Sequence, residues 1–582
     1  MINRRKLLFR GGGAALGMAS AIGALKFATS ESAGITPQVP PKDFPKLKAI
    51  ITLGGVEYVY DAASGQDLGD YVGEFVKQRC VRVLEPRLPL TVFFRPDVEG
   101  DRIEVVVELG RMWPTSTPPA HILDPYTVEV TNDDRQISNI EVPYHWWWAR
   151  WRWQSSPRPF VRKVAELMAA NHLPHLGSND IISTGSSIGA QKYTNPMDKA
   201  GLLFDSSTGE RGEIGPISEA QAEWILNGDE TALQTMMAQA EACATAPIHW
   251  RDEKTGAFID FQKYPKASMN PFNGDPIIPM VPAPKMQDGK PDGRYMHPET
   301  SHTPAVAYVP YILTDDPYYL EELQACGALA IGFTAFTREQ YRLPGLVTVG
   351  QTRAFAWSMR TLFQLGKTQP DSVPSWLLSK TYWLKCIADN RSFMQRYMDS
   401  PARVHSYFRQ FPDTGSIGPW QNCFISFILG WAIQMGYHEW TAAYAWHLPG
   451  VLAFADAKSG WNRQYPTPYF WNALDFWPAQ DDHTFIADTS LDAHTLSDWA
   501  AAWTFFKLHH DIDDSAWDGH SIMTKSTAYI LYLYGSAKLA ASLGFKEAAE
   551  PLAWLEAEIP RMPNDTGVTT VRGFAKWSLA SG

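Results

Sequence analysis

The order of apolar and polar positions divides the 582-residue chain into two parts that meet near residue 157. Between residues 46 and 153, short runs rich in Val, Ile and Thr alternate with polar residues, as in residues 90–94, 102–108 and 126–131. Pro, Gly, Asn and Asp separate these runs. A period of two indicates strands with one buried face, and several short strands in succession favour an antiparallel sandwich. We therefore predict a β-sandwich domain over residues 33–157.

From residue 158 to residue 582 the apolar period becomes helical, in pairs of helices joined by short polar turns. In the clearest pair, helices over residues 219–226 and 231–244 flank the turn Asn227-Gly228-Asp229-Glu230. Gly suits the end of a helix and Asp the start of the next. Further pairs are expected over residues 304–331, 353–390, 420–454 and 527–558. Because one pair cannot bury its own apolar face, we predict that the pairs stack and close into an (α/α) toroid, which makes the whole chain multidomain α+β.

A small β domain followed by serial helical hairpins with long loops resembles the α/α-toroid carbohydrate-active enzymes, the six-hairpin glycosidase-like group. The resemblance lies in the architecture and covers most of the chain. It implies cleavage of glycosidic bonds, by hydrolysis or by β-elimination, in a cleft at the loop-bearing end of the ring. It also implies that residues 158–582 form the catalytic domain.

The first 32 residues contain the parts of an export signal in the expected order. Arg4-Arg5 precedes a Gly/Ala-rich apolar run over residues 11–28, and small residues follow at Ala28-Thr29-Ser30. This order is typical of a signal peptide, and paired arginines are typical of twin-arginine export. The alternative is a basic start before an ordinary core helix. We predict that residues 1–32 are a signal peptide and that the mature protein is periplasmic or secreted.

Replacing Arg4 and Arg5 together by lysine should leave the precursor in the cytoplasm, because the arginine pair is the address that the export machinery reads. Cell fractionation, with detection of the mature chain, measures the effect. Normal export of the double-lysine variant would contradict the twin-arginine assignment.

Charge and cysteine content exclude several classes of partner. The net charge is −11 and no Lys/Arg-rich run follows the signal, so we expect no nucleic-acid partner. No later run reaches the ~18 apolar residues of a membrane span. The five cysteines lack zinc-site spacing and are predicted to be buried, although an oxidised pair stays open. His297, Glu299 and His302 match no standard metal spacing, so neither a metal nor a cofactor is predicted.

The aromatic content suits a polysaccharide or oligosaccharide substrate. The chain has 23 Trp and 23 Tyr, and several Trp lie in polar, proline-broken segments. Indole faces pack against the C–H faces of sugars, although a large core is the alternative. In residues 144–153, Trp147, Trp151 and Trp153 share one face of a strand. They form either a sugar-binding strip flanked by arginines or, as we favour, an aromatic seam that joins the sheet to the next domain.

Candidate catalytic residues lie in loops that lead into helices. Glu213 precedes a helix within a Gly-rich segment, where the helix dipole favours its charged form. Glu299, His302 and Tyr308 lie together in residues 295–311, and Asp475 follows a Trp-Asn pair. His or Tyr serves as a general acid or base, and a carboxylate serves in either role. The alternatives are a helix-start acid for Glu213 and a buried hydrogen-bonded cap for residues 295–311.

Predicted substrate contacts carry an aromatic ring, a guanidinium or an amide in or beside these loops. Arg353, Trp357 and Arg360 share one helix face. Arginines in an apolar helix require anionic partners, either protein carboxylates or the carboxylate of an acidic sugar. The full set is Arg211, Trp250, Arg251, Tyr311, Gln351, Arg353, Trp357, Arg360, Trp420, Trp461 and Trp471.

These residues fit two reactions. Hydrolysis uses two carboxylates across a cleft, which Glu213, Glu299 and Asp475 supply. β-Elimination from a uronic acid uses a His or Tyr base and an arginine, and the candidates are His302, Tyr308, Arg353 and Arg360. The domain order favours a glycoside hydrolase, with a polysaccharide lyase and a non-catalytic glycan-binding or polysaccharide-assembly protein as alternatives. Because inner helices of serial hairpins run in one direction, residues 210–216, 249–252, 295–311 and 351–360 are expected to line one cleft.

Overall fold

The computed structural model describes the chain from residue 44 to residue 580 with several gaps. The signal peptide predicted over residues 1–32 and the candidate acid Asp475 lie outside the described residues. The described ranges are 44–110, 121–178, 182–183, 189–204, 211–252, 255–268, 285–286, 288–290, 292–333, 335–349, 351–399, 406–408, 416–468, 471–472, 498–513, 515, 527–561, 571–572 and 575–580.

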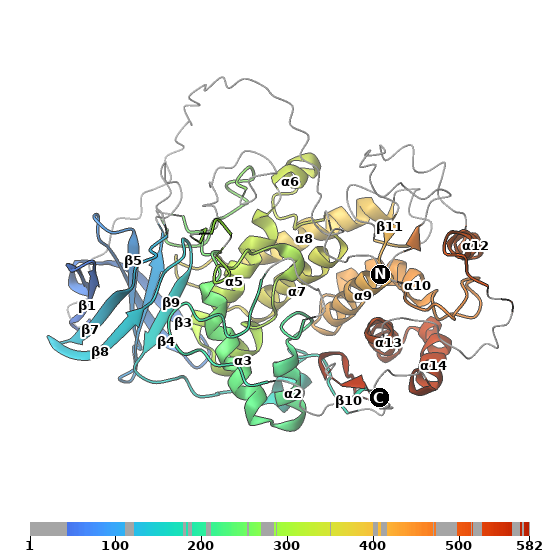
Figure 1. Ribbon diagram of the computed structural model, residues 1–582, viewed down its shortest axis with the longest axis horizontal. Helices are drawn as coiled ribbons and strands as arrows, with labels where there is room; N and C mark the ends of the chain where they lie inside the picture. Colours follow the sequence, from blue (N-terminus) through green and yellow to red (C-terminus); the bar gives the residue numbers. More distant parts are fainter. Residues whose placement is uncertain are drawn as a thin grey trace, which may run out of the picture.

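Two antiparallel sheets form the N-terminal part, as predicted (Figure 1). One sheet has the strand order β2-β1-β7-β8 and the other has the order β3-β4-β5-β6-β9. Strands β5 and β6 are buried at every position, whereas β8 is largely exposed. The strands are β1 (Leu47–Leu53), β2 (Val56–Asp61), β3 (Gln66–Val72), β4 (Lys77–Leu84), β5 (Leu90–Pro96), β6 (Ile103–Leu109), β7 (Tyr126–Asn132), β8 (Arg135–Val142) and β9 (Arg150–Gln154).

Buried His145 connects the two sheets and should make the protein sensitive to acid. It lies between the Tyr126 hydroxyl, 2.7 Å from Nδ1, and the Ala149 carbonyl, 2.9 Å from Nε2. Burial lowers its pKa to about 3, below the value of about 6.5 in the unfolded chain. The unfolded state therefore binds the extra proton, and the stability from neutral His145 is lost as the pH falls below about 6.5.

The expected loss from His145 is about 1.4 kcal/mol in the free energy of unfolding per pH unit between these two pKa values. Urea unfolding at about pH 7 and about pH 5.5 measures it. The variant His145→Gln, compared at the same two pH values, should show a smaller loss. An equal loss in both proteins would show that another group causes the acid sensitivity.

Helices follow the sheets, and they pair as hairpins where the sequence predicted them. Gly228, in the left-handed conformation at φ 65°, ends α2, and Asp229 caps α3 by accepting a hydrogen bond from the amide of Ala232. The helices are α1 (Val164–Ala169), α2 (Glu219–Asn227), α3 (Glu230–Ala242), α4 (Tyr308–Thr314), α5 (Pro317–Gly332), α6 (Ala335–Tyr341), α7 (Thr352–Thr368), α8 (Lys380–Met398), α9 (Pro419–Gln434), α10 (Thr441–Leu452), α12 (Trp499–His509), α13 (Thr527–Ser542) and α14 (Ala549–Glu558).

The first helices of three hairpins, α7, α9 and α13, pack side by side, with α9 between the other two. Helix α7 also packs against α5, which is the second helix of its own hairpin. The C-terminal turn η9 (Ala575–Trp577) contacts both α13 and α2, so the end of the chain returns to the first hairpin. Within the described residues beyond 157, strands occur only as two-residue pairs, β10 (Ile182–Ser183) with β13 (Val571–Arg572) and β11 (Ser416–Ile417) with β12 (Trp471–Asn472). The helical part is thus organised by helix pairs and not by a central sheet.

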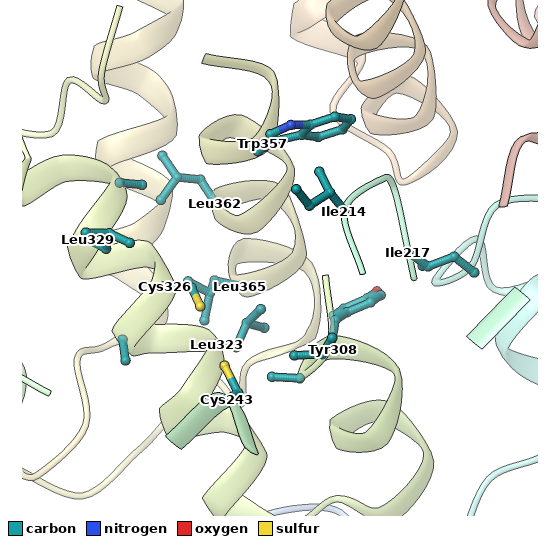
Figure 2. Packing of buried hydrophobic residues seen from close by; sticks show 14 of the residues in the cluster. Ile214, Ile217, Cys243, Tyr308, Leu323, Cys326, Leu329, Trp357, Leu362 and Leu365 are labelled. Atoms are coloured by element: carbon teal, nitrogen blue, oxygen red, sulfur yellow. The ribbon is translucent and has the colours of Figure 1, made fainter. Parts of the chain in front are cut away.

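One part of the hydrophobic core lies between α5 and α7 (Figure 2). Leu323 and Leu329 of α5 lie opposite Leu362 and Leu365 of α7. All five cysteines are buried free thiols, as predicted, and two of them, Cys243 and Cys326, lie in this core. No helix in the described residues has both the length and the apolar content needed to cross a bilayer.

Strand β9 presents its two faces to different layers. The Trp151 indole donates to the Tyr126 hydroxyl of the other sheet at 3.1 Å, so this side chain packs inside the sandwich. Arg150 and Arg152 point to the helices and contact Glu322 and Asp316, each at 2.7 Å. The prediction that indoles of this strand join the sheet to the next domain is therefore wrong for Trp151. Arginine side chains make that contact.

Glu321 on α5 lies at the centre of this interface. It accepts hydrogen bonds from Arg95 at 2.5 and 3.0 Å and from Arg251 at 2.7 Å, and it lies 2.8 Å from Arg150. All four side chains are fully buried. Burial opposes ionisation of Glu321, but the three guanidinium groups hold its pKa well below the usual range. The two parts of the chain are thus joined by buried ion pairs.

Candidate functional site

Two loops that precede helices are held together by one arginine of α7. The guanidinium of Arg360 donates to the carbonyl of Gly215 at 2.7 Å. Its other terminal nitrogen donates to the carbonyls of Thr303 and Pro304 at 3.2 and 3.1 Å. One planar group therefore brings the loop before α2 and the loop before α4 side by side.

Glu213 lies where these loops meet. Its carbonyl accepts a hydrogen bond of 2.8 Å from the amide of Ala305, and its carboxylate lies 2.5 Å from Nε of Arg211. The Glu213 side chain is 7% exposed. The next residue, Ile214, lies close to Trp357 of α7 (Figure 2).

Glu299 and His302 form a hydrogen-bonded pair on the second loop, in and beside the turn η4 (Thr300–His302). The Glu299 carboxylate contacts Nδ1 of His302 and accepts a hydrogen bond of 2.6 Å from the Ser301 hydroxyl. The Glu299 side chain is 29% exposed, whereas that of His302 is 2% exposed. A carboxylate at Nδ1 fixes the orientation of the imidazole. The first helix expected within residues 304–331 begins at Tyr308, and residues 300–302 form a separate turn.

Lys576, near the C-terminus, also holds the first loop. Its ammonium group donates to the carbonyls of Arg211 at 2.9 Å and Ile214 at 2.5 Å. The Glu219 carboxylate accepts hydrogen bonds from the amides of Ala575 and Lys576, and burial raises the pKa of Glu219. Sequence reasoning missed Lys576, because nothing in the local pattern relates residue 576 to residues 211–214.

Arg360 does not have the protein carboxylates that were one of its two expected kinds of partner. Within the described part of the chain, its guanidinium contacts backbone carbonyls and the Thr361 hydroxyl. Burial lowers the pKa of Arg360 to about 10. Carbonyl dipoles here take the place of a formal negative charge.

Replacing Arg360 by methionine should lower the free energy of unfolding by about 2–3 kcal/mol, because the buried carbonyls of Gly215, Thr303 and Pro304 lose their donor. Urea unfolding measures the change. The matched control is Arg396→Met, since exposed Arg396 donates to a single carbonyl, that of Tyr341. Equal, small losses in the two variants would show that Arg360 does not hold the loops.

Several predicted substrate contacts lie at the start of α7 and α9. The Arg353 guanidinium lies 5.7 Å from the ring centre of Trp420, in the first turn of α9. Trp357 packs on Phe424 with ring centres 4.7 Å apart. Gln351 immediately precedes α7. The N-terminal ends of the two neighbouring helices thus bring Arg353 and Trp420 together.

Other candidates have different surroundings. Trp250 and Arg251 lie beside the sandwich, where Trp250 packs on Trp148 and Arg251 donates to Glu108 at 2.9 Å. The hydroxyl of Tyr308 donates to the His172 carbonyl, and that of Tyr311 donates to the Thr368 carbonyl. Trp461 packs on Trp503 of α12, and Trp471 belongs to β12. The structure therefore groups residues 211–216, 299–305 and 353–360, and it places residues 250–251 at the sandwich.

Within the described ranges, no three His, Cys, Asp or Glu side chains come together in a way that would hold a metal ion. No protein-family model, curated protein or solved structure matches this chain.

Proposed function

We propose that this protein is an exported carbohydrate-active enzyme that hydrolyses glycosidic bonds in a polysaccharide or oligosaccharide. The observation that carries the proposal is the pairing of the Glu213 loop with the Glu299–His302 loop through Arg360. Hydrolysis requires an ionised carboxylate and a proton donor held at a fixed separation. A rigid clamp between two loops provides such a separation.

The contacts of Glu213 and of the Glu299–His302 pair suggest different roles for them in hydrolysis. Arg211 lies 2.5 Å from Glu213 and holds its carboxylate in place, and Glu213 serves as base or nucleophile. The Glu299 carboxylate contacts His302, and this pair serves as the acid for the leaving oxygen.

The arrangement of the helices also supports the proposal. Serial hairpins with α7, α9 and α13 side by side, and a C-terminal turn that returns to α2, are what an (α/α) toroid requires. In this reading residues 158–582 form the toroid and residues 33–157 form the β-sandwich that packs against it. The twin-arginine signal would place the enzyme outside the cytoplasm, where polysaccharides are found.

Elimination by a polysaccharide lyase is the second candidate, because the Glu299–His302 pair is also suited to remove a proton from a uronic acid. Two other residues of that mechanism are engaged within the protein. The Tyr308 hydroxyl donates to His172, and Arg360 donates to three backbone carbonyls. Hydrolysis is therefore preferred.

A panel of glycans incubated with the purified mature protein tests the proposal. Hydrolysis produces new reducing ends alone, whereas elimination produces reducing ends together with unsaturated products. The variant Glu213→Gln is the inactive control. Retained glycan binding without either product would indicate a non-catalytic glycan-binding protein, and the absence of both binding and products would refute the proposal.

A further inference from the structure

A separate cavity of about 490 Å³ opens where the end of the sandwich meets the helical part. Residues 143–144 line one side, Asn195 and residues 198–203 line the second, and Gly293 and Arg294 line the third. Its volume lies within the range of pockets that hold small ligands. The cavity shares no residue with the Glu213 loop or the Glu299 loop.

The loop over residues 195–203 has an unusual backbone. Met197 and Ala200 have positive φ angles of 71° and 44°, which non-glycine residues rarely adopt. Both residues are buried, and the Tyr144 hydroxyl donates to the carbonyl of Met197 at 3.3 Å. Strained backbone persists where the surroundings impose it, and it gathers at ligand sites.

The charged groups at this cavity balance one another. Arg294 forms a two-point ion pair with Asp292, at 3.0 and 2.6 Å. Asp198 accepts hydrogen bonds from the Thr194 hydroxyl and the Ala200 amide, and Lys199 donates to the Gly293 carbonyl at 2.9 Å. Two cations therefore accompany two carboxylates. Such a site has no surplus charge to neutralise an acidic ligand.

The rest of the lining combines polar and apolar surface. The Arg294 guanidinium lies 4.3 Å from the ring centre of Tyr144, while Pro143 and Leu203 add apolar surface. Asn195, which is exposed, contributes an amide with both a donor and an acceptor. Hydrogen-bonding groups of both kinds beside apolar surface match a sugar, which has hydroxyl groups and C–H faces.

The cavity is joined to the candidate site by a short stretch of chain. Arg294 lines the cavity and Glu299 lies five residues later, so their backbones are at most ~18 Å apart. We propose that this cavity is a distal subsite that binds an uncharged sugar residue of the same glycan that is cleaved between Glu213 and Glu299. This inference rests on the proposed function for the identity of the glycan. The cavity determines the class of ligand, a neutral saccharide.

Calorimetric titration of the mature Glu213→Gln protein tests the assignment, with neutral oligosaccharides and uronate oligosaccharides of matched length as probes. The variant Asn195→Phe fills the cavity from an exposed position. It should weaken binding of the neutral oligosaccharides at least about tenfold, as the loss of a hydrogen-bonded subsite requires. Lys199→Met removes one donor and should act in the same direction. The matched control is Ser372→Phe, which fills a second cavity of about 680 Å³. This variant should bind the neutral oligosaccharides as tightly as the parent does.

Neutral-oligosaccharide binding that is the same in Asn195→Phe, Lys199→Met and the parent would overturn the assignment, as would binding of uronate oligosaccharides alone. Turnover separates this inference from the proposed function. In the active protein, Asn195→Phe should raise KM with little change in kcat. Sugar binding that depends on Asn195, in a protein that cleaves no glycan, would refute the proposed function and retain the subsite.

Discussion

Replacing Glu321 by alanine should prevent stable folding, or lower the free energy of unfolding by about 3–5 kcal/mol. The change leaves Arg95, Arg150 and Arg251 buried without the carboxylate that all three contact. Each arginine keeps one other carboxylate, Glu104, Glu322 or Glu108, but the buried cluster loses one negative charge, and removing one partner of buried ion pairs is strongly destabilising. The loss is expected to separate the sheets from α5, since these contacts cross that interface.

Urea unfolding followed by circular dichroism and by tryptophan fluorescence measures the change. Glu321→Gln keeps the shape and removes the charge, so it should also destabilise the protein, by a smaller amount. The control is Glu166→Gln, because the Lys163–Glu166 pair is exposed and should contribute less than about 0.5 kcal/mol. A Glu321→Ala protein within about 1 kcal/mol of the parent would show that the buried pairs do not join the two parts.

Much of the secondary structure could be predicted, because local chemistry specifies it. The turn at Gly228 and Asp229 needs only a left-handed residue followed by a capping side chain, and both are visible in the sequence. The placement of β9 could not be predicted in the same way. A period of two shows that Arg150 and Trp151 face opposite sides, but it does not show which layer each side meets.

The loops that carry the candidate residues could be predicted from the sequence, but the side chains that hold these loops in place could not. Glu213 and His302 stood out as ionisable residues just ahead of helices. The groups that hold them, Arg360 and Lys576, act on backbone carbonyls. Carbonyls are present at every residue and therefore leave no signal in the sequence. The same holds for the cavity beside Tyr144, whose walls come from three separate segments.

Replacing Glu213 by glutamine should reduce kcat about 10²–10⁴-fold while the protein stays folded. Glutamine keeps the size of the side chain and one acceptor for Arg211, but it lacks the charge that hydrolysis uses. Glu299→Gln should have an effect of similar size, because it removes the acidic partner of His302. Reducing-end release from the glycan identified in the panel measures both variants, and thermal unfolding confirms that each is folded.

Comparison of Glu213→Gln with His302→Ala distinguishes the two mechanisms. In hydrolysis, Glu213 reacts directly and its loss is the more severe. In elimination, His302 is the base, so His302→Ala should abolish turnover while Glu213→Gln retains much of it. The control is Glu230→Gln, because Glu230 lies at the exposed start of α3 and outside the two candidate loops. Full activity in Glu213→Gln, Glu299→Gln and His302→Ala would move the chemistry away from these loops, and Asp475 would then be the next acid to replace.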